Sequence, residues 1–244
     1  MNVSLLLRVK AEVVLGFLLA VRNRPVRIAC LLSVTMVSLS VLEKLGQTPR
    51  TDQQTTVFLI AGSIAAMVGA RLLAPGGALA ASRQVAARFW LVPLGRLTGG
   101  ALVVLPIVAV AALSLRTVEV SPLQLSVAAA VFSVALGAGV MTLAPAMGGS
   151  AAAVVGFVAA CVGVVPPADL HATFERWPLV QRSLALIWQL FPLQWRAGRL
   201  LDSFHWIDAA FFGGWIVIGV VLAGWFTTPV RYSDRWFRGT AWRH

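Results

Sequence analysis

The stretch FWLVPLGRLTGGALVVLPIVAVAA, residues 89–112, contains the pattern that decides the fold of this chain. Its second half is almost wholly apolar, and the run over 97–115 is close to the roughly 20 residues that a membrane-crossing helix needs. Pro93, Gly95 and Arg96 come directly before that run. The stretch therefore predicts a transmembrane helix with a basic flank.

The composition of the whole chain is that of a polytopic membrane protein. Of its 244 residues, 59% are hydrophobic and only 12% are charged, and the mean hydropathy is +0.84. A soluble domain of this size needs more charge to cover its surface, whereas lipid solvates apolar side chains. We therefore expect an all-α polytopic membrane protein. Cys30 and Cys161 lie in apolar runs and are expected to be buried thiols.

Six apolar segments approach the length of a span: residues 27–45, 55–74, 97–115, 122–145, 149–166 and 208–228. A further apolar stretch, residues 3–21, carries three charged residues in its first half, and Pro25 separates it from the first span. Its uninterrupted apolar run is too short to cross a bilayer, so it is predicted to be an amphipathic helix at the cytoplasmic surface. A cleaved signal peptide is the competing interpretation, but no small-residue cleavage site precedes Pro25.

The charges are distributed unequally between the two faces that this topology predicts. With a cytoplasmic N-terminus, the inner face has 13 basic and two acidic residues, and the outer face has seven of each. The net charge of +11 therefore falls on the inner face, as the positive-inside rule predicts. We expect an integral protein of the bacterial cytoplasmic (inner) membrane with both termini cytoplasmic. Anionic lipids account for this charge, and no nucleic-acid-binding motif accompanies it, so nucleic acid is not an expected partner.

The predicted topology divides the chain into five parts. They are a cytoplasmic amphipathic interfacial helix (1–26), transmembrane helices one to five (27–166) with a cytoplasmic coupling loop (75–96), an extracytoplasmic segment with short helices (167–207), the sixth transmembrane helix (208–228) and a basic cytoplasmic tail (229–244).

The external segment before the last span is predicted to be interfacial or re-entrant. Its apolar run over 184–190 is too short to cross the bilayer and stops before Pro192. Indoles favour the headgroup layer, and arginines reach lipid phosphates from there. The residues expected to act in this way are Trp188, Trp195, Arg196 and Arg199. Asp202 is within one helical turn of Arg199 and is its expected partner.

The sequence contains no recognisable catalytic constellation. Its two lysines, Lys10 and Lys44, lack the glycine spacing of a P-loop, so the chain is not expected to hydrolyse ATP itself. We expect no catalytic residues, no metal ligands and no cofactor in this chain. His171, Glu175 and His205 allow an external metal site to be imagined, but polar loop residues are the simpler interpretation.

The order of the predicted parts resembles the membrane subunit of the type-2 ABC exporters. A basic surface helix and two spans precede an Ala/Arg-rich cytoplasmic segment (80–89), which leads through Pro93 and Arg96 into the third span. Three more spans follow, with a long external segment before the last. The acidic residues usual in that family's loop are absent here. The resemblance implies a separate nucleotide-binding ATPase subunit that binds ATP and Mg, and a second permease copy or homologue. It also implies coupling residues, which here are Arg22, Arg24, Arg83, Gln84 and Arg88.

The function that follows from the resemblance is that of a permease subunit of an ATP-driven exporter. The sequence does not identify the substrate, although an amphipathic or lipid-like molecule suits the apolar spans. A non-catalytic membrane scaffold or assembly subunit is the first alternative, and a membrane-embedded enzyme that uses the external loop is the second. Gly95 and Gly99 permit close helix approach, either within the chain or at an oligomer seam.

Overall fold

The computed structural model describes residues 3–24, 26–28, 30–31, 52–73, 90–114, 121–163, 175–190, 194–202 and 205–227. Every regular element in these ranges is a helix, so the predicted all-α fold is confirmed for them. Four of the described helices are long and apolar enough to cross a membrane: α3 (Asp52–Leu72), α5 (Leu91–Ser114), α6 (Pro122–Met147) and α11 (Trp206–Thr227). This is the architecture expected of an integral membrane protein.

Two of the six predicted spans are not among these four helices. The first, residues 27–45, falls almost wholly outside the described residues. The fifth, residues 149–166, corresponds to α7 (Gly149–Val162), which has only 14 residues. At about 1.5 Å per residue α7 is about 21 Å long, shorter than a hydrocarbon core of about 30 Å. The count of six spans therefore stays a prediction.

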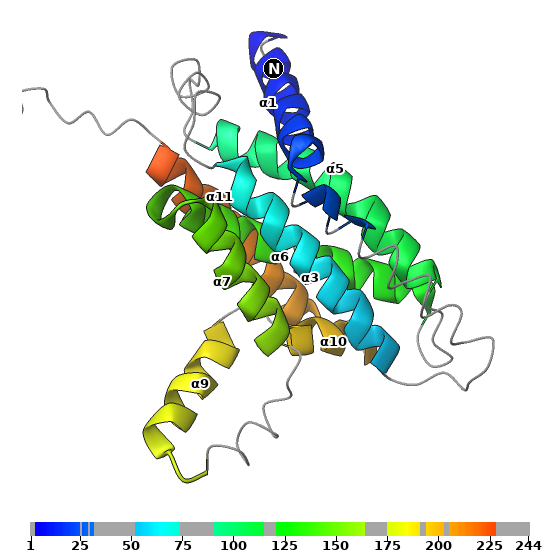
Figure 1. The fold of residues 1–244 in the computed structure, drawn as a ribbon, viewed down its shortest axis with the longest axis vertical. Helices are drawn as coiled ribbons and strands as arrows, with labels where there is room; N and C mark the ends of the chain where they lie inside the picture. The colour runs from blue at the N-terminus through cyan, green and yellow to red at the C-terminus, as the bar shows by residue number, and fades with distance from the viewer. Residues whose placement is uncertain are drawn as a thin grey trace, which may run out of the picture.

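Helix α6 lies at the centre of the bundle and contacts α3, α5, α7 and α11 (Figure 1). Its core is apolar, and Phe132 of α6 meets Phe58 of α3 edge to face with a centroid distance of 5.8 Å. Gly62 of α3 lies against Phe132, and Gly69 lies against Gly137 of α6, so α3 and α6 run in the same direction. This arrangement brings small residues of neighbouring helices into backbone contact.

A one-residue break separates α6 from α7. Gly148 has a φ of +86°, a backbone conformation that strains residues with a side chain, and its N–H donates to the carbonyl of Ala144 at 3.0 Å. Helix α7 then returns along α3, where Gly156 contacts Ala66. The link between α6 and α7 is thus a tight turn at Gly148.

Three shorter or peripheral helices complete the described fold. Helix α1 (Val3–Arg22) packs against the first half of α5, and α10 (Gln194–Asp202) packs on α6 at the opposite end of the bundle (Figure 1). We refer to these as the α1 end and the α10 end. Helix α9 (Pro178–Leu190) projects away from the other described helices, with Leu179 exposed.

Replacing Gly69 with alanine should destabilise the bundle, because the new Cβ atom would lie 2.5 Å from the carbonyl oxygen of Gly137. We expect Gly69→Ala to lower the free energy of unfolding by about 1–3 kcal/mol through overpacking. Gly213→Ala is the matched control, since a Cβ atom at Gly213 meets nothing within 4 Å and alanine favours the helix. Unfolding in detergent measures both variants, and equal stability of the two would contradict this packing.

Candidate functional site

The first cluster is built around Arg96, whose side chain is only 1% exposed in the second turn of α5. Its Nε donates to Oε2 of Glu12 in α1 at 2.9 Å. Its Nη1 donates to the main-chain carbonyl of Leu72, the last residue of α3, at 2.7 Å. The Arg96 cluster, defined as Glu12, Arg96 and the Leu72 carbonyl, thus joins three helices through one guanidinium.

Glycines allow α1 to approach α5 closely enough for this pairing. A Cβ atom on Gly95 would lie 2.6 Å from the Cβ of Glu12, and one on Gly99 would overlap the carbonyl oxygen of Val13. Gly16 of α1 faces the backbone of Arg96 in the same way. The four-residue spacing of Gly95 and Gly99 therefore serves packing within the chain, which was one of the two alternatives left open by the sequence.

The Arg96 cluster also supplies a hydrogen-bond donor to a carbonyl at the C-terminus of α3. The last four carbonyls of a helix lack intrahelical partners, and the Leu72 carbonyl finds its partner in Arg96. A cation at a helix C-terminus is favoured by the helix dipole as well. Because both charges of the pair are largely buried, each depends on the other to offset the loss of hydration.

The structure changes the predicted boundary of the coupling loop. Residues 91–96, expected to lie in the loop 75–96, form the first turns of α5 instead. Pro93 does not prevent this, because the first N–H groups of a helix need no intrahelical acceptor. The prediction was therefore wrong at this end, and it missed the pairing of Arg96 with Glu12.

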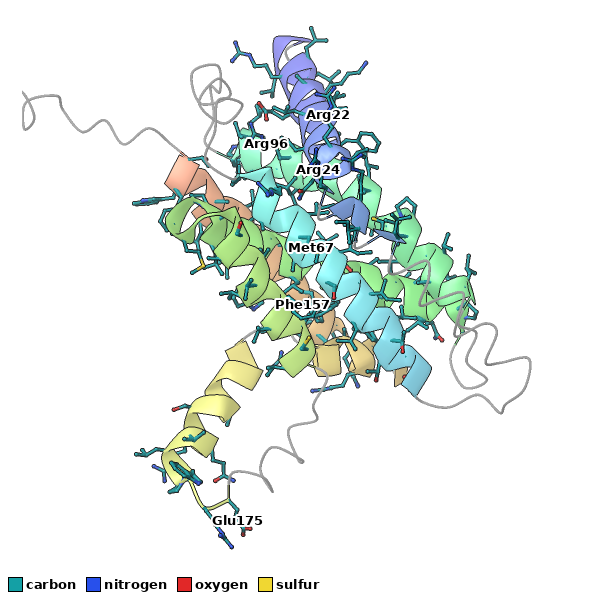
Figure 2. The ribbon with its side chains drawn as sticks, viewed as in Figure 1. Arg22, Arg24, Met67, Arg96, Phe157 and Glu175 are labelled. Atoms are coloured by element: carbon teal, nitrogen blue, oxygen red, sulfur yellow. The ribbon has the colours of Figure 1, made fainter. Side chains whose placement is uncertain are left out.

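The predicted coupling residues are only partly described. Arg22 and Arg24 are exposed, and Figure 2 places both at the α1 end together with Arg96. Arg83, Gln84 and Arg88 lie outside the described residues, between Leu73 and Trp90. Leu73 directly follows the Arg96-bound end of α3, and Trp90 directly precedes α5.

The second cluster lies at the α10 end and is centred on Asp208. This acid lies in the first turn of α11 and is only 2% exposed. Nε of Arg199 is 3.4 Å from its Oδ2, and Nη1 of Arg196 is 3.9 Å from its Oδ1. The Arg196 guanidinium also lies 4.0 Å from the ring centroid of Phe211, a cation–π contact. The Asp208 cluster, defined as Arg196, Arg199, Asp208 and Phe211, holds α10 against α11.

The sequence singled out both arginines of this cluster as interfacial residues, but their pairing with Asp208 was not predicted. Asp202 was the expected partner of Arg199, whereas the ion pair in the described residues joins Arg199 to Asp208. The side chains of Asp202, Trp188 and Trp195, and the whole of Pro192, lie outside the described part of the chain. The signal that identifies Asp208 is an acid at the start of an otherwise apolar helix.

The described residues give no support to an external metal site at His171, Glu175 and His205. Among the described residues, no group of three His, Cys, Asp or Glu side chains could hold a metal ion. Glu175 and His205 are both exposed, and Figure 2 shows Glu175 beyond the far end of α9, away from the bundle. His171 lies outside the described residues.

No protein-family model matches this chain, and no curated protein or solved structure matches it either. The two clusters and the long apolar helices that carry them are therefore the features that bear on function.

The Glu12–Arg96 pair should show strong energetic coupling. Removing one charge leaves the other buried without its partner, so Glu12→Gln and Arg96→Met should each cost about 3–5 kcal/mol. The loss of unfolding free energy in the double variant should be smaller than the summed losses of the two single variants, by about 1–3 kcal/mol. Arg71→Met, an exposed arginine at the same end, should change stability by less than about 0.5 kcal/mol. Additive single effects in the unfolding measurements would contradict a direct interaction.

Loss of the Asp208 charge should release α10. Ala197 of α10 is fully buried, so a cysteine placed there should react slowly with a maleimide in a chain whose Cys30 and Cys161 are replaced by serine. Adding Asp208→Asn should speed the reaction by about tenfold or more, since it removes the charge that both arginines contact. Glu175→Gln, at an exposed acid, is the control and should leave the rate unchanged. If labelling in Asp208→Asn stays as slow as in Glu175→Gln, then packing alone holds α10 and the ion pairs do not.

Proposed function

We propose that this chain is the membrane-spanning permease subunit of an ATP-driven exporter, with ATP hydrolysis carried out by a separate subunit. The observation that carries the proposal is the Arg96 cluster. It ties together α1, the last residue of α3 and the first turns of α5. The predicted coupling loop 75–96, which the resemblance assigns to ATPase docking, lies between the end of α3 and the second turn of α5.

The Arg96 cluster suits the transmission of force. A displacement of α1, or of the segment between α3 and α5, acts on both spanning helices because a buried ion pair and a hydrogen bond connect them. Breaking the pair costs several kcal/mol, so the three helices are expected to move as a unit. This is the property that a coupling element needs when ATP binding shifts a permease between two states.

The proposed partners follow from chemistry that this chain does not supply. An ATPase subunit that binds ATP and Mg would contact the exposed Arg22 and Arg24 and the segment with Arg83, Gln84 and Arg88. These residues are basic or polar, so acidic side chains on the ATPase surface are the complementary partners. A second permease copy or a homologue would complete the pathway. In this arrangement the α1 end faces the cytoplasm, in agreement with the basic excess there.

A non-catalytic membrane scaffold is the second candidate. It is favoured by the close packing of the described bundle, in which a Cβ atom added to several glycines of α3, α5, α6 and α7 would lie within 4 Å of a neighbouring helix. Such packing suits a rigid anchor as well as a moving permease. The two candidates differ in whether an ATPase accompanies the chain and responds to it.

Purification of the tagged full chain from its native membrane in mild detergent tests the proposal. We expect a subunit with a P-loop to co-purify in near-stoichiometric amount, and its ATPase activity to depend on the permease. Glu12→Gln should then reduce the permease-dependent ATPase activity by about tenfold while the complex still assembles, because the coupling path is broken. Arg71→Gln serves as the control, since Arg71 is exposed at the same end. A pure chain that brings no P-loop subunit would contradict the proposal and favour the scaffold.

A further inference from the structure

An exposed apolar stripe follows the length of α11. Its residues include Trp206, Ile207, Val217, Ile218, Val221 and Trp225, all of which are exposed. Trp206 and Trp225 lie at its two ends, and each is 73% exposed. They are nineteen residue steps apart, which corresponds to about 28 Å of helix at about 1.5 Å per step. This length matches a hydrocarbon core of about 30 Å.

The two tryptophans therefore mark the levels of the two membrane interfaces, since indoles favour the boundary between lipid tails and headgroups. Asp208 is two residues from Trp206, so the Asp208 cluster lies at the headgroup level of the α10 end. An ion-pair cluster at this depth is adjacent to lipid phosphates.

Arg199 is the member of this cluster that remains open to a ligand. Its side chain is 50% exposed, whereas that of Asp208 is 2% exposed. Within the described residues, Arg199 pairs through its Nε with Asp208, and its terminal nitrogens make no further hydrogen bond or ion pair. Two arginines face one carboxylate, so the cluster has a net charge of +1 at the surface.

We infer that the Asp208 cluster is a binding site for a bilayer phospholipid with an anionic headgroup. Arg199 donates to the phosphate oxygens, for which the planar guanidinium fork is well suited. Asp208 acts as a positioning residue because its Oδ2 lies 3.4 Å from Nε of Arg199 and attracts that side of the guanidinium. The acyl chains lie along the exposed stripe that begins at Trp206 and Ile207. This site depends only on the membrane location of α11 and not on an ATPase partner.

Titration of the purified full chain with phosphatidylglycerol and with phosphatidylcholine, followed by native mass spectrometry, tests the inference. We expect one phosphatidylglycerol to bind about fivefold more tightly than phosphatidylcholine, because one extra surface charge contributes on that order. Arg199→Gln should weaken phosphatidylglycerol binding by about tenfold through loss of a charge-assisted hydrogen bond. Arg182→Gln is the matched control, since Arg182 is an exposed arginine on α9, and it should change binding by less than about twofold.

Three results would overturn the inference: equal affinities for the two lipids, equal losses in the two arginine variants, or displacement of the lipid by soluble glycerol phosphate at a similar concentration. The last result would assign a site for a small anion rather than for a lipid.

A second measurement uses the wild-type chain and so does not depend on how Arg199→Gln folds. A phosphatidylglycerol analogue with a photoreactive diazirine close to the headgroup should label peptides from α10 and the first turn of α11. Adducts confined to α1 or α9 would contradict the site.

Discussion

The buried guanidinium of Arg96 determines how the N-terminal helix sits on this bundle. Without it, Glu12 of α1 would lose its ion pair with α5, and the carbonyl at the end of α3 would lose its side-chain donor. The pairing with Glu12 in turn requires close backbone approach, which Gly16, Gly95 and Gly99 permit. Charge and packing are thus interdependent at this point, because neither a bulkier residue nor an unpaired charge can be accommodated there.

The two ion-pair clusters follow one physical rule at opposite ends of the bundle. Arg96 places a positive charge at the C-terminus of α3, and Asp208 places a negative charge at the N-terminus of α11, and both positions are favoured by the helix dipole. Each cluster also attaches a shorter helix to a membrane-crossing one. Helix α1 is held at one end by Arg96 and α10 at the other end by Asp208, so both helices are fixed by polar contacts near helix termini.

The sequence predicts the described helices well, because long apolar runs are a strong signal. The predicted spans 55–74, 122–145 and 208–228 agree with α3, α6 and α11 to within a few residues. The start of α5 was placed about six residues too late, since Pro93, Gly95 and Arg96 are typical of a loop but here lie in helical turns. Small and polar residues mark both loops and close helix contacts, and only the neighbouring helix distinguishes the two.

Partners in the clusters were harder to predict, because sequence spacing informs only on residues of one helix. Spacing pointed from Arg199 to Asp202, whose side chain lies outside the described residues, and could not reveal Asp208 on the next helix. Glu12 and Arg96 are 84 residues apart, and no local pattern connects them. The exporter function, the ATPase partner and the membrane orientation stay predictions, since they depend on molecules outside this chain.

Hydrogen exchange of the full chain in lipid nanodiscs, compared between the wild type and Arg96→Gln, tests the central claim most directly. Because one guanidinium joins three helices, the amides of α1, of the last turn of α3 and of residues 91–100 should lose protection together. The amides at the start of α11, which belongs to the separate Asp208 cluster, should exchange at the same rates in both proteins. Unchanged protection of α1 in the variant would contradict the claim that Arg96 holds the N-terminal helix to the bundle.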